Sequence, residues 1–295
     1  MPAGVIAGTS APTREGRAAA TTVRTLRRWL PLAPALIFLA AFFVYPLVRM
    51  LALSLAAAEG PLAYYAAIVT SPVYMTVLGL TFKMALGVTL ICVALGVPTA
   101  YLLAHLSGTW RNVLLVAVAL PFLTSILIRT YAWMAILGRQ GVVNQLLQWA
   151  GLTDAPVRLM HNELGVYVGM VHVLLPFMIL PVYSVMSAID RRLLRAAESL
   201  GATPRRALLT VYLPLALPGI ASGALLVFLI AIGFYITPAL LGGPKQVMIS
   251  NLIEVQVIEL LNWGFGSALA FVLLAATVLL MIVFDRFLGL ERLTV

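Results

Sequence analysis

Six apolar runs, each long enough to cross a lipid bilayer, constrain this chain more than any other feature. They cover residues 32–55, 76–104, 112–137, 165–188, 215–240 and 264–288. A spanning helix needs about 20 mainly apolar residues. Only 10% of the 295 residues are charged, whereas soluble domains carry about 25%. The sequence therefore predicts an all-α membrane protein with six transmembrane helices and excludes a soluble enzyme as the main interpretation.

The basic residues are divided unequally between the two sides of such a bundle. Thirteen lie in the segments on the N-terminal side, and only Arg139, Arg158 and Lys245 lie in the loops on the other side. Because positively charged loops stay in the cytoplasm, we expect both termini to be cytoplasmic. Residues 1–30 form a predicted basic tail and residues 31–295 the transmembrane domain. An organelle transit peptide is the alternative interpretation of the tail.

The sequence lacks the patterns that carry catalysis or cofactor binding. No Gly-x-x-x-x-Gly-Lys-Ser/Thr loop is present to hold a nucleotide, and Cys92 is the single cysteine. His105, His161 and His172 are too scattered to suggest a metal site or a nucleophile with its base. The basic residues are not interleaved with aromatics, as nucleic-acid binding would require. We therefore expect no catalytic, cofactor or metal site and no nucleic-acid partner.

The segment from residue 190 to residue 214 reads as two short amphipathic helices. Apolar residues recur at helical spacing at Leu193, Leu194, Ala197, Leu200 and Gly201, opposite Arg191, Arg192, Arg195 and Glu198. Gly201 is suited to ending the first helix in a left-handed conformation, and Thr203 and Pro204 to starting the second. Leu208, Leu209 and Tyr212 continue an apolar stripe until Pro214, where we expect the helix to stop. One face would then dock on the bundle while the charged face meets a partner.

This segment resembles the EAA loop of bacterial ABC importer permeases. The stretch Arg195-Ala196-Ala197-Glu198-Ser199-Leu200-Gly201 is followed nine residues later by Val211-Tyr212-Leu213-Pro214. In that family the loop is a coupling helix seated in a groove of the cytoplasmic ATPase subunit. The resemblance implies coupling roles for Arg195, Ala196, Ala197, Glu198, Gly201, Leu213 and Pro214. Arg195 replaces the glutamate that names the motif, and Glu198, one turn later on the same face, offers an acid instead.

Two further stretches resemble permeases of the spermidine/putrescine type. One runs from Ser125 to Met134 and is followed by Gly138, Gly141 and Asn144. The other comprises residues 236–244, 249–252 and 262–268. Phe234 stands where several members of that group have an acidic residue, so an opine, an amino-acid derivative or a phosphonate is the alternative solute.

The resemblance implies a type I, MetI-like permease of the bacterial inner membrane. Its expected partners are a second permease, two ATPase subunits that use ATP and Mg, a periplasmic solute-binding protein and membrane lipid. The candidate pathway residues are Arg129, Tyr131, Trp133, Tyr235 and Thr237. An intramembrane charge is costly, which makes Arg129 a gate candidate, with an interfacial anchor as the alternative. An ATP-independent carrier or channel is the alternative class, and a membrane-embedded enzyme is disfavoured by the missing ionisable clusters.

Overall fold

The computed structural model describes residues 30–288, which fall into two units divided between Leu53 and Ser54. The predicted basic tail lies outside the described residues, except for its last residue. In the first unit, the 3-10 turn η1 (Leu30–Leu32) leads into α2 (Ala33–Leu39), the π-helical turn η2 (Ala40–Val44) and α3 (Tyr45–Ser54), whose last residue already belongs to the second unit. Residues 33–54 form one apolar helix long enough to span a membrane. None of residues 33–53 is buried.

The second unit is also built from helices, and its described part contains no strand. In chain order it comprises α4 (Ala63–Thr70), α5 (Pro72–His105), α6 (Gly108–Ala119), η3 (Leu120–Leu123), α7 (Ile126–Leu137), α8 (Val142–Trp149), α9 (Glu163–Ala188), α10 (Arg191–Ser199), α11 (Pro204–Ala207), η4 (Leu208–Tyr212), α12 (Leu213–Ile232), α13 (Ile236–Leu241), α14 (Ile249–Glu254), η5 (Val255–Glu259) and α15 (Trp263–Leu288). The all-α prediction is confirmed.

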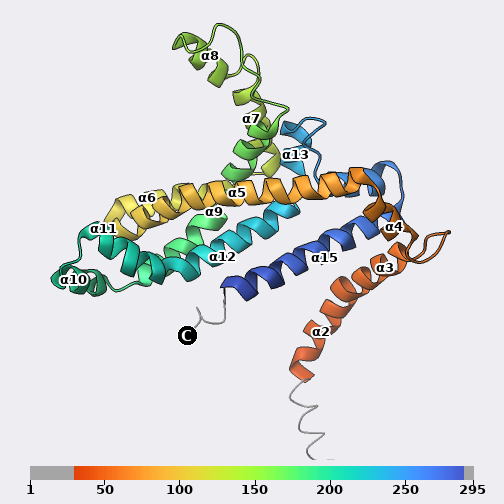
Figure 1. Cartoon of the computed structure of the whole chain (residues 1–295), viewed down its shortest axis with the longest axis horizontal. Coiled ribbons are helices and arrows are strands. Elements are labelled where there is room, and N and C mark those ends of the chain that lie inside the picture. Colours follow the sequence, from red (N-terminus) through yellow and green to blue (C-terminus); the bar gives the residue numbers. More distant parts are fainter. Residues whose placement is uncertain (1–29, 289–295) are drawn as a thin grey trace, which may run out of the picture. The chain divides into compact units, whose positions relative to one another are not determined.

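The core lies where α5, α9 and α12 pack against one another (Figure 1). Met178 of α9 is completely buried and lies between two glycines, Gly96 of α5 and Gly223 of α12. An added Cβ would approach Met178 within 2.7 Å at Gly96 and within 3.0 Å at Gly223. Small residues at these positions therefore let the three helices approach closely, as is common in membrane bundles.

The span predicted at 112–137 is not one unbroken helix. The structure has two helical segments there, Gly108–Leu123 and Ile126–Trp149, which bend by 101° at Thr124 and Ser125. The chain tightens into the 3-10 turn η3 around Pro121, whose missing N–H and rigid φ disfavour a regular α-helix. The side chain and the backbone N–H of Thr124 both donate to the Pro121 carbonyl and close the turn. The described residues thus contain five long apolar helices, or six spans if the bent pair is counted as one.

The predicted span at 215–240 also needs correction at both ends. Its helix ends at Ile232, and α13 begins separately at Ile236. At the other end, Pro214 does not stop the helix, because residues 204–232 form one continuous helical segment. The π-helical turn η4 precedes Pro214 just as η2 precedes Pro46. A π-turn shifts the hydrogen bonds by one residue, which accommodates a proline that lacks its own N–H.

Candidate functional site

The segment resembling a coupling loop folds into two helices joined by a tight turn. The Asp190 carboxylate accepts a hydrogen bond from the Arg192 N–H at 2.8 Å and begins α10. Gly201 ends α10 with φ at +89°, and the Gly201 and Ala202 N–H groups donate to the Glu198 and Ala197 carbonyls. This is a Schellman motif, which favours glycine at the left-handed position. The helix pair and the role of Gly201 in its turn are confirmed.

The apolar face of this loop is only partly covered. Leu194 and Ala197 are half-buried, but Leu193 is exposed and Leu200 retains 89% of its accessible surface. The prediction that the whole stripe docks on the bundle is therefore wrong for Leu193 and Leu200. The reason is that α10 packs mainly against α11 and η4 and leaves its other side open.

The charged side chains of the loop point to solvent. Arg192, Arg195, Arg205 and Arg206 are exposed, and none of them forms an ion pair with an acid in the part of the chain that the structure describes. Glu198 and Ala196 are also exposed. Leu213 and Pro214 lie at the start of α12, where Leu213 is half-buried and Pro214 exposed. The loop therefore combines a basic surface with uncovered leucines.

The three candidate pathway residues of α7 do not share one face. Arg129 and Trp133 are one turn apart, and both are half-buried. The Trp133 Nε1–H donates to His172 Nδ1 on α9 at 3.2 Å, and the two rings meet edge to face. Tyr131 lies on the opposite side of α7 and is exposed. The structure thus brings Arg129 and Trp133 together and leaves Tyr131 apart; nothing in the sequence marked His172 as their neighbour.

Of the other two candidates, Tyr235 lies in the break between α12 and α13 and Thr237 in the first turn of α13. Hydrogen bonds from α14 hold this break in place. Ser250 Oγ donates to the Phe234 carbonyl at 2.6 Å, and Asn251 Nδ2 donates to the Tyr235 carbonyl at 3.1 Å. The N–H of Ile249, at the start of α14, donates to Thr81 Oγ1 of α5 at 2.9 Å. The Phe234 carbonyl, whose helical donor four residues later would be the N–H that Pro238 lacks, therefore has a partner in Ser250. The Tyr235 carbonyl accepts from the Ala239 N–H within α13 and gains Asn251 as a second donor.

Tyr235 and Thr237 have different surroundings. Thr237 is fully buried, and its Oγ1 has no hydrogen-bond partner among the described residues. Tyr235 is partly exposed and lines a cavity of about 460 Å³ together with Glu254, Arg158 and His161. Burial, followed by the negative charge of Glu254, raises the pKa of the Tyr235 phenol above its usual value near 10, so the phenol is neutral at physiological pH.

The part of the cavity lining that contains His161 is fixed by contacts with backbone carbonyls. The His161 N–H donates to the Leu241 carbonyl at 2.8 Å, and His161 Nδ1 lies 3.3 Å from the Gly242 carbonyl oxygen. His161 adopts a positive φ of 56°, which is uncommon for a residue with a side chain. These contacts join the loop before α9 to the end of α13.

Comparison with known proteins agrees with this architecture. Residues 93–290 match the family described as binding-protein-dependent transport system inner membrane component. The chain belongs to this family. It is 40% identical over 215 residues to the spermidine/putrescine transport system permease protein PotB of Escherichia coli (strain K12). The matched region covers 73% of this chain and 78% of that protein. It is 33% identical over 204 residues to the inner membrane ABC transporter permease protein YdcU of the same strain, and this matched region covers 65% of each of the two chains.

A solved structure supports the fold of this permease. The bacterial ABC transporter involved in the import of the acidic polysaccharide alginate superposes with a TM-score of 0.75 at 19% identity, over 95% of this chain and all of that chain. The family consists of transport permeases rather than enzymes. Within residues 30–288 of this permease, no three His, Cys, Asp or Glu side chains lie close enough together to hold a metal ion.

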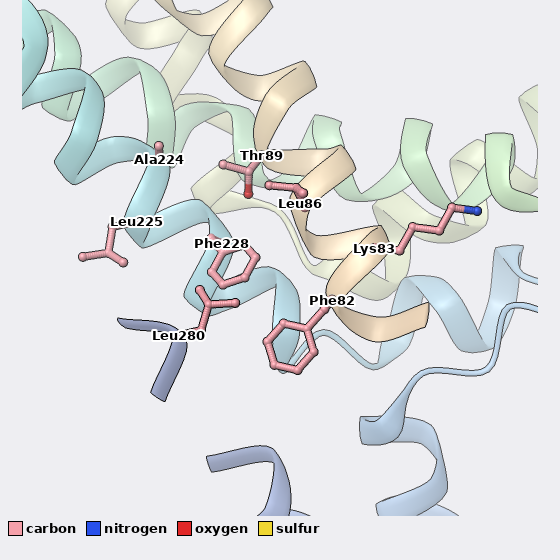
Figure 2. A pocket seen from close by; sticks show the side chains of 8 residues that line it. All are labelled: Phe82, Lys83, Leu86, Thr89, Ala224, Leu225, Phe228 and Leu280. Atoms are coloured by element: carbon pink, nitrogen blue, oxygen red, sulfur yellow. The ribbon is translucent and has the colours of Figure 1, made fainter. Parts of the chain in front are cut away.

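Nothing in the sequence indicated the ion pair that Lys83 of this permease forms with Glu163. Lys83 Nζ donates to both carboxylate oxygens of Glu163, at 2.7 and 2.9 Å, and so joins α5 to the start of α9. The partner was hard to find because it lies 80 residues away in sequence. Figure 2 shows the Lys83 ammonium directed away from Phe228 and Leu280, which help to line an apolar cavity of about 260 Å³.

Sequence reasoning also missed Glu254. The one available signal was its place between the apolar residues Ile253 and Val255, two residues after residues 249–252, which resemble the outer loop of polyamine permeases. Asn144, by contrast, was noted in the resemblance, and the structure gives it a structural role. Its side chain bonds the Gly138 carbonyl and both the N–H and the carbonyl of Val157, which fixes α8 to the loop that follows it.

Proposed function

We propose that this permease passes spermidine or putrescine across the bacterial inner membrane in an ATP-driven importer supplied by a periplasmic binding protein. The observation that carries the proposal is the 40% identity to spermidine/putrescine permeases over 73% of the chain. Two structural features agree with that similarity: a basic loop at residues 190–214, and a cavity at the helix break beyond Ile232 whose lining includes Glu254 and Arg158. Another small organic solute is the alternative, since Phe234 is apolar.

The proposed assembly contains a second permease, two ATPase subunits and the binding protein. In this arrangement both termini and the loop at 190–214 face the cytoplasm, with residues 1–30 as a basic tail and residues 31–295 as the transmembrane domain. ATP and Mg bind to the ATPase subunits, and this chain needs no cofactor and no nucleic acid. Membrane lipid surrounds the apolar helices, whose exposed residues include many large hydrophobic side chains.

The continuous helix from Pro204 to Ile232 suggests how the ATPase drives transport. Its 29 residues span roughly 43 Å at the usual helical rise. One end begins at the turn after Gly201, and the other ends beside the break that contains Tyr235. We infer that closure of the ATPase subunits pushes on the coupling loop and that this helix carries the displacement to the cavity.

The charges of the coupling loop suggest the surface that receives it. The exposed arginines have no acid of their own chain as an ion-pair partner within the described residues, and Leu200 is uncovered. A groove on the partner with an apolar floor and acidic walls would cover Leu200 and pair with the exposed arginines. Arg195 then contacts an acidic residue of the ATPase. The glutamate that usually occupies this position of the motif would instead require a basic residue as its partner.

Arg129 is proposed to act on the pathway rather than as an anchor. Its Nε is buried without a hydrogen-bond partner among the described residues, and it lies on the side of α7 that carries Trp133. We expect Arg129→Ala to lower uptake while the complex still assembles, and Arg129→Lys to retain more uptake because it keeps the charge. The measurement is ATP-driven uptake by purified complexes in vesicles. Normal uptake by Arg129→Ala would return Arg129 to an anchoring role.

The proposed function is tested by purification from native membranes followed by reconstitution. The tagged chain is expected to bring an ATPase with a phosphate-binding loop, a second permease and a binding protein. Vesicles that contain this complex should accumulate radiolabelled putrescine or spermidine only with ATP and the binding protein. A chain that purifies alone and transports without ATP would establish the carrier class instead. ATP-driven uptake of another solute, without polyamine uptake, would overturn the polyamine assignment alone.

A further inference from the structure

The cavity beside the break between α12 and α13 has an asymmetric charge distribution. It is lined by residues from three segments, the loop before α9, the α13 region and α14. Glu254 lies on α14 and Tyr235 in the helix break, while Arg158 and His161 come from the loop. Its volume of about 460 Å³ falls within the usual range of roughly 300–1,000 Å³ for small-molecule sites.

Glu254 and Tyr235 offer the chemistry that recognises an alkylammonium group. A carboxylate has two oxygens with about four lone-pair sites, so Glu254 can interact with the Tyr235 phenol and still accept from a second donor. A neutral aromatic ring attracts a cation to its face, most strongly where water is excluded. Glu259 lies outside the cavity lining but adds a second negative charge that acts on Tyr235.

The backbone of this corner is fixed before any solute arrives. Asn251 holds the Tyr235 carbonyl and also accepts from the Met248 N–H, at 3.1 Å in each case. Glu254 lies three residues after Asn251 on the same short helix. The aromatic ring and the carboxylate are therefore carried by segments that are hydrogen-bonded to each other, which lowers the cost of ordering them on binding.

We propose that Glu254 and Tyr235 form a subsite that receives a primary ammonium group of the passing solute, with Arg158 placing a repulsive charge elsewhere on the cavity wall. The subsite deepens the proposed import function and rests on it for the identity of the solute. It assigns to Glu254, on α14, the negative charge that the resemblance led us to seek at Phe234. Arg158 would favour a linear cation that enters with its ammonium toward α14.

The first test measures the charge preference of the cavity without using transport. Ala239 is exposed and lines the same cavity, and the native Cys92 is fully buried. In the purified complex carrying Ala239→Cys, a methanethiosulfonate with an ammonium group should react faster than one with a sulfonate group. Adding Glu254→Gln should lower the ratio of the two rates by about tenfold, because it removes a unit negative charge from the lining of the same cavity.

Glu259→Gln is the matched control, since it removes the same charge from outside the cavity lining and should change the ratio less. Arg158→Gln should raise the ratio, because it removes a repulsive charge. A ratio that Glu254→Gln leaves unchanged, or a faster reaction with the sulfonate reagent, would overturn the subsite. The ratio of labelling rates can be measured whether or not the complex transports polyamines. A failure of the subsite proposal can therefore be distinguished from a failure of the proposed function.

The second test is ATP-driven uptake of radiolabelled putrescine by reconstituted complexes. Glu254→Gln should lower initial uptake at subsaturating putrescine by about tenfold, Glu254→Asp should restore part of it, and Arg158→Gln should not reduce it. Loss of uptake in Arg158→Gln with normal uptake in Glu254→Gln would mean that the cavity receives an anionic group. If the wild-type complex transports no polyamine, the proposed function fails, and the labelling ratio alone decides the subsite.

Discussion

The coupling loop and the α13–α14 corner differ in how their conformations are fixed. In the loop, the stabilising bonds are local, from Asp190 to Arg192 and from Gly201 and Ala202 back into α10. In the corner, the bonds connect distant segments, such as Ile249 to Thr81, which are 168 residues apart. The loop therefore has a fixed backbone but exposes arginines and leucines, whereas the backbone of the corner is fixed by hydrogen bonds between distant segments of the chain.

This difference indicates different tasks. The coupling loop exposes arginines and leucines that nothing else in the described chain covers, so its surface is suited to completion by another subunit. The corner provides partners for backbone groups at the helix break and borders an open cavity, so it is suited to receive a small solute. The helix from Pro204 to Ile232 joins them. Substitutions in the loop should therefore affect coupling, and substitutions in the corner should affect stability and solute handling.

The largest effect is expected at Gly201. An added Cβ would meet no atom within 4 Å, so the cost there is conformational, from a φ of +89°. We expect Gly201→Asp to insert normally and to abolish ATP-driven uptake, because it adds strain and a negative charge facing the acidic groove that we propose. Gly201→Asn is the matched control, since asparagine has a similar size and also visits the left-handed region. It should retain measurable uptake, and equal loss in both variants would remove the charge argument.

A large loss of stability is expected from Gly141→Ala. A Cβ at this position would collide with the backbone oxygen of Ile136, which cannot move as a flexible side chain can. We expect a destabilisation of about 1–3 kcal/mol or more, as for overpacked sites. Gly79→Ala is the control because its Cβ would meet nothing. Tm values of the purified complexes in detergent provide the comparison; a Gly141→Ala complex as stable as Gly79→Ala would contradict the close approach.

The same contrast explains what could be predicted from sequence. The helix pair of the coupling loop was predicted because its signals are local, with Thr203 and Pro204 next to the helix they begin and Gly201 at the turn. The apolar runs also predicted the positions of the long helices, because a helix that spans a membrane needs about 20 mainly apolar residues. Helix breaks were missed where apolar composition continues through them, as at Thr124 and Gly233.

The candidate site was less predictable, because its contacts depend on tertiary structure. Tyr235 was chosen from a resemblance, but its neighbour Glu254 is 19 positions away and was not chosen. His172 meets Trp133 across 39 positions, and apolar periodicity carries no information about that pairing. The exposure of Leu200 was also unpredictable, since an amphipathic pattern shows which face is apolar but not which protein covers it.

A moderate effect is expected at Asn251. Asn251→Ala leaves the Met248 N–H without its partner and leaves the Tyr235 carbonyl with the Ala239 N–H as its one remaining donor among the described residues. An unsatisfied buried polar group costs about 1–3 kcal/mol, so Tm of the complex should fall. Ser250→Ala removes a single bond, to the Phe234 carbonyl, and should lower Tm less. A larger effect of Ser250→Ala would mean that Phe234 rather than Tyr235 is the position that α14 holds.

The smallest effect is expected at the ion pair between Lys83 and Glu163. The side chains of Lys83 and Glu163 are 59% and 40% exposed, and exposed ion pairs contribute little because water competes for both charges. Lys83→Met and Glu163→Gln should each lower Tm less than Asn251→Ala does, and the difference should shrink at high salt. Lys83→Glu combined with Glu163→Lys should restore Tm. A larger and salt-independent effect would mean that lipid rather than water surrounds the pair, since a low dielectric strengthens the attraction between the charges.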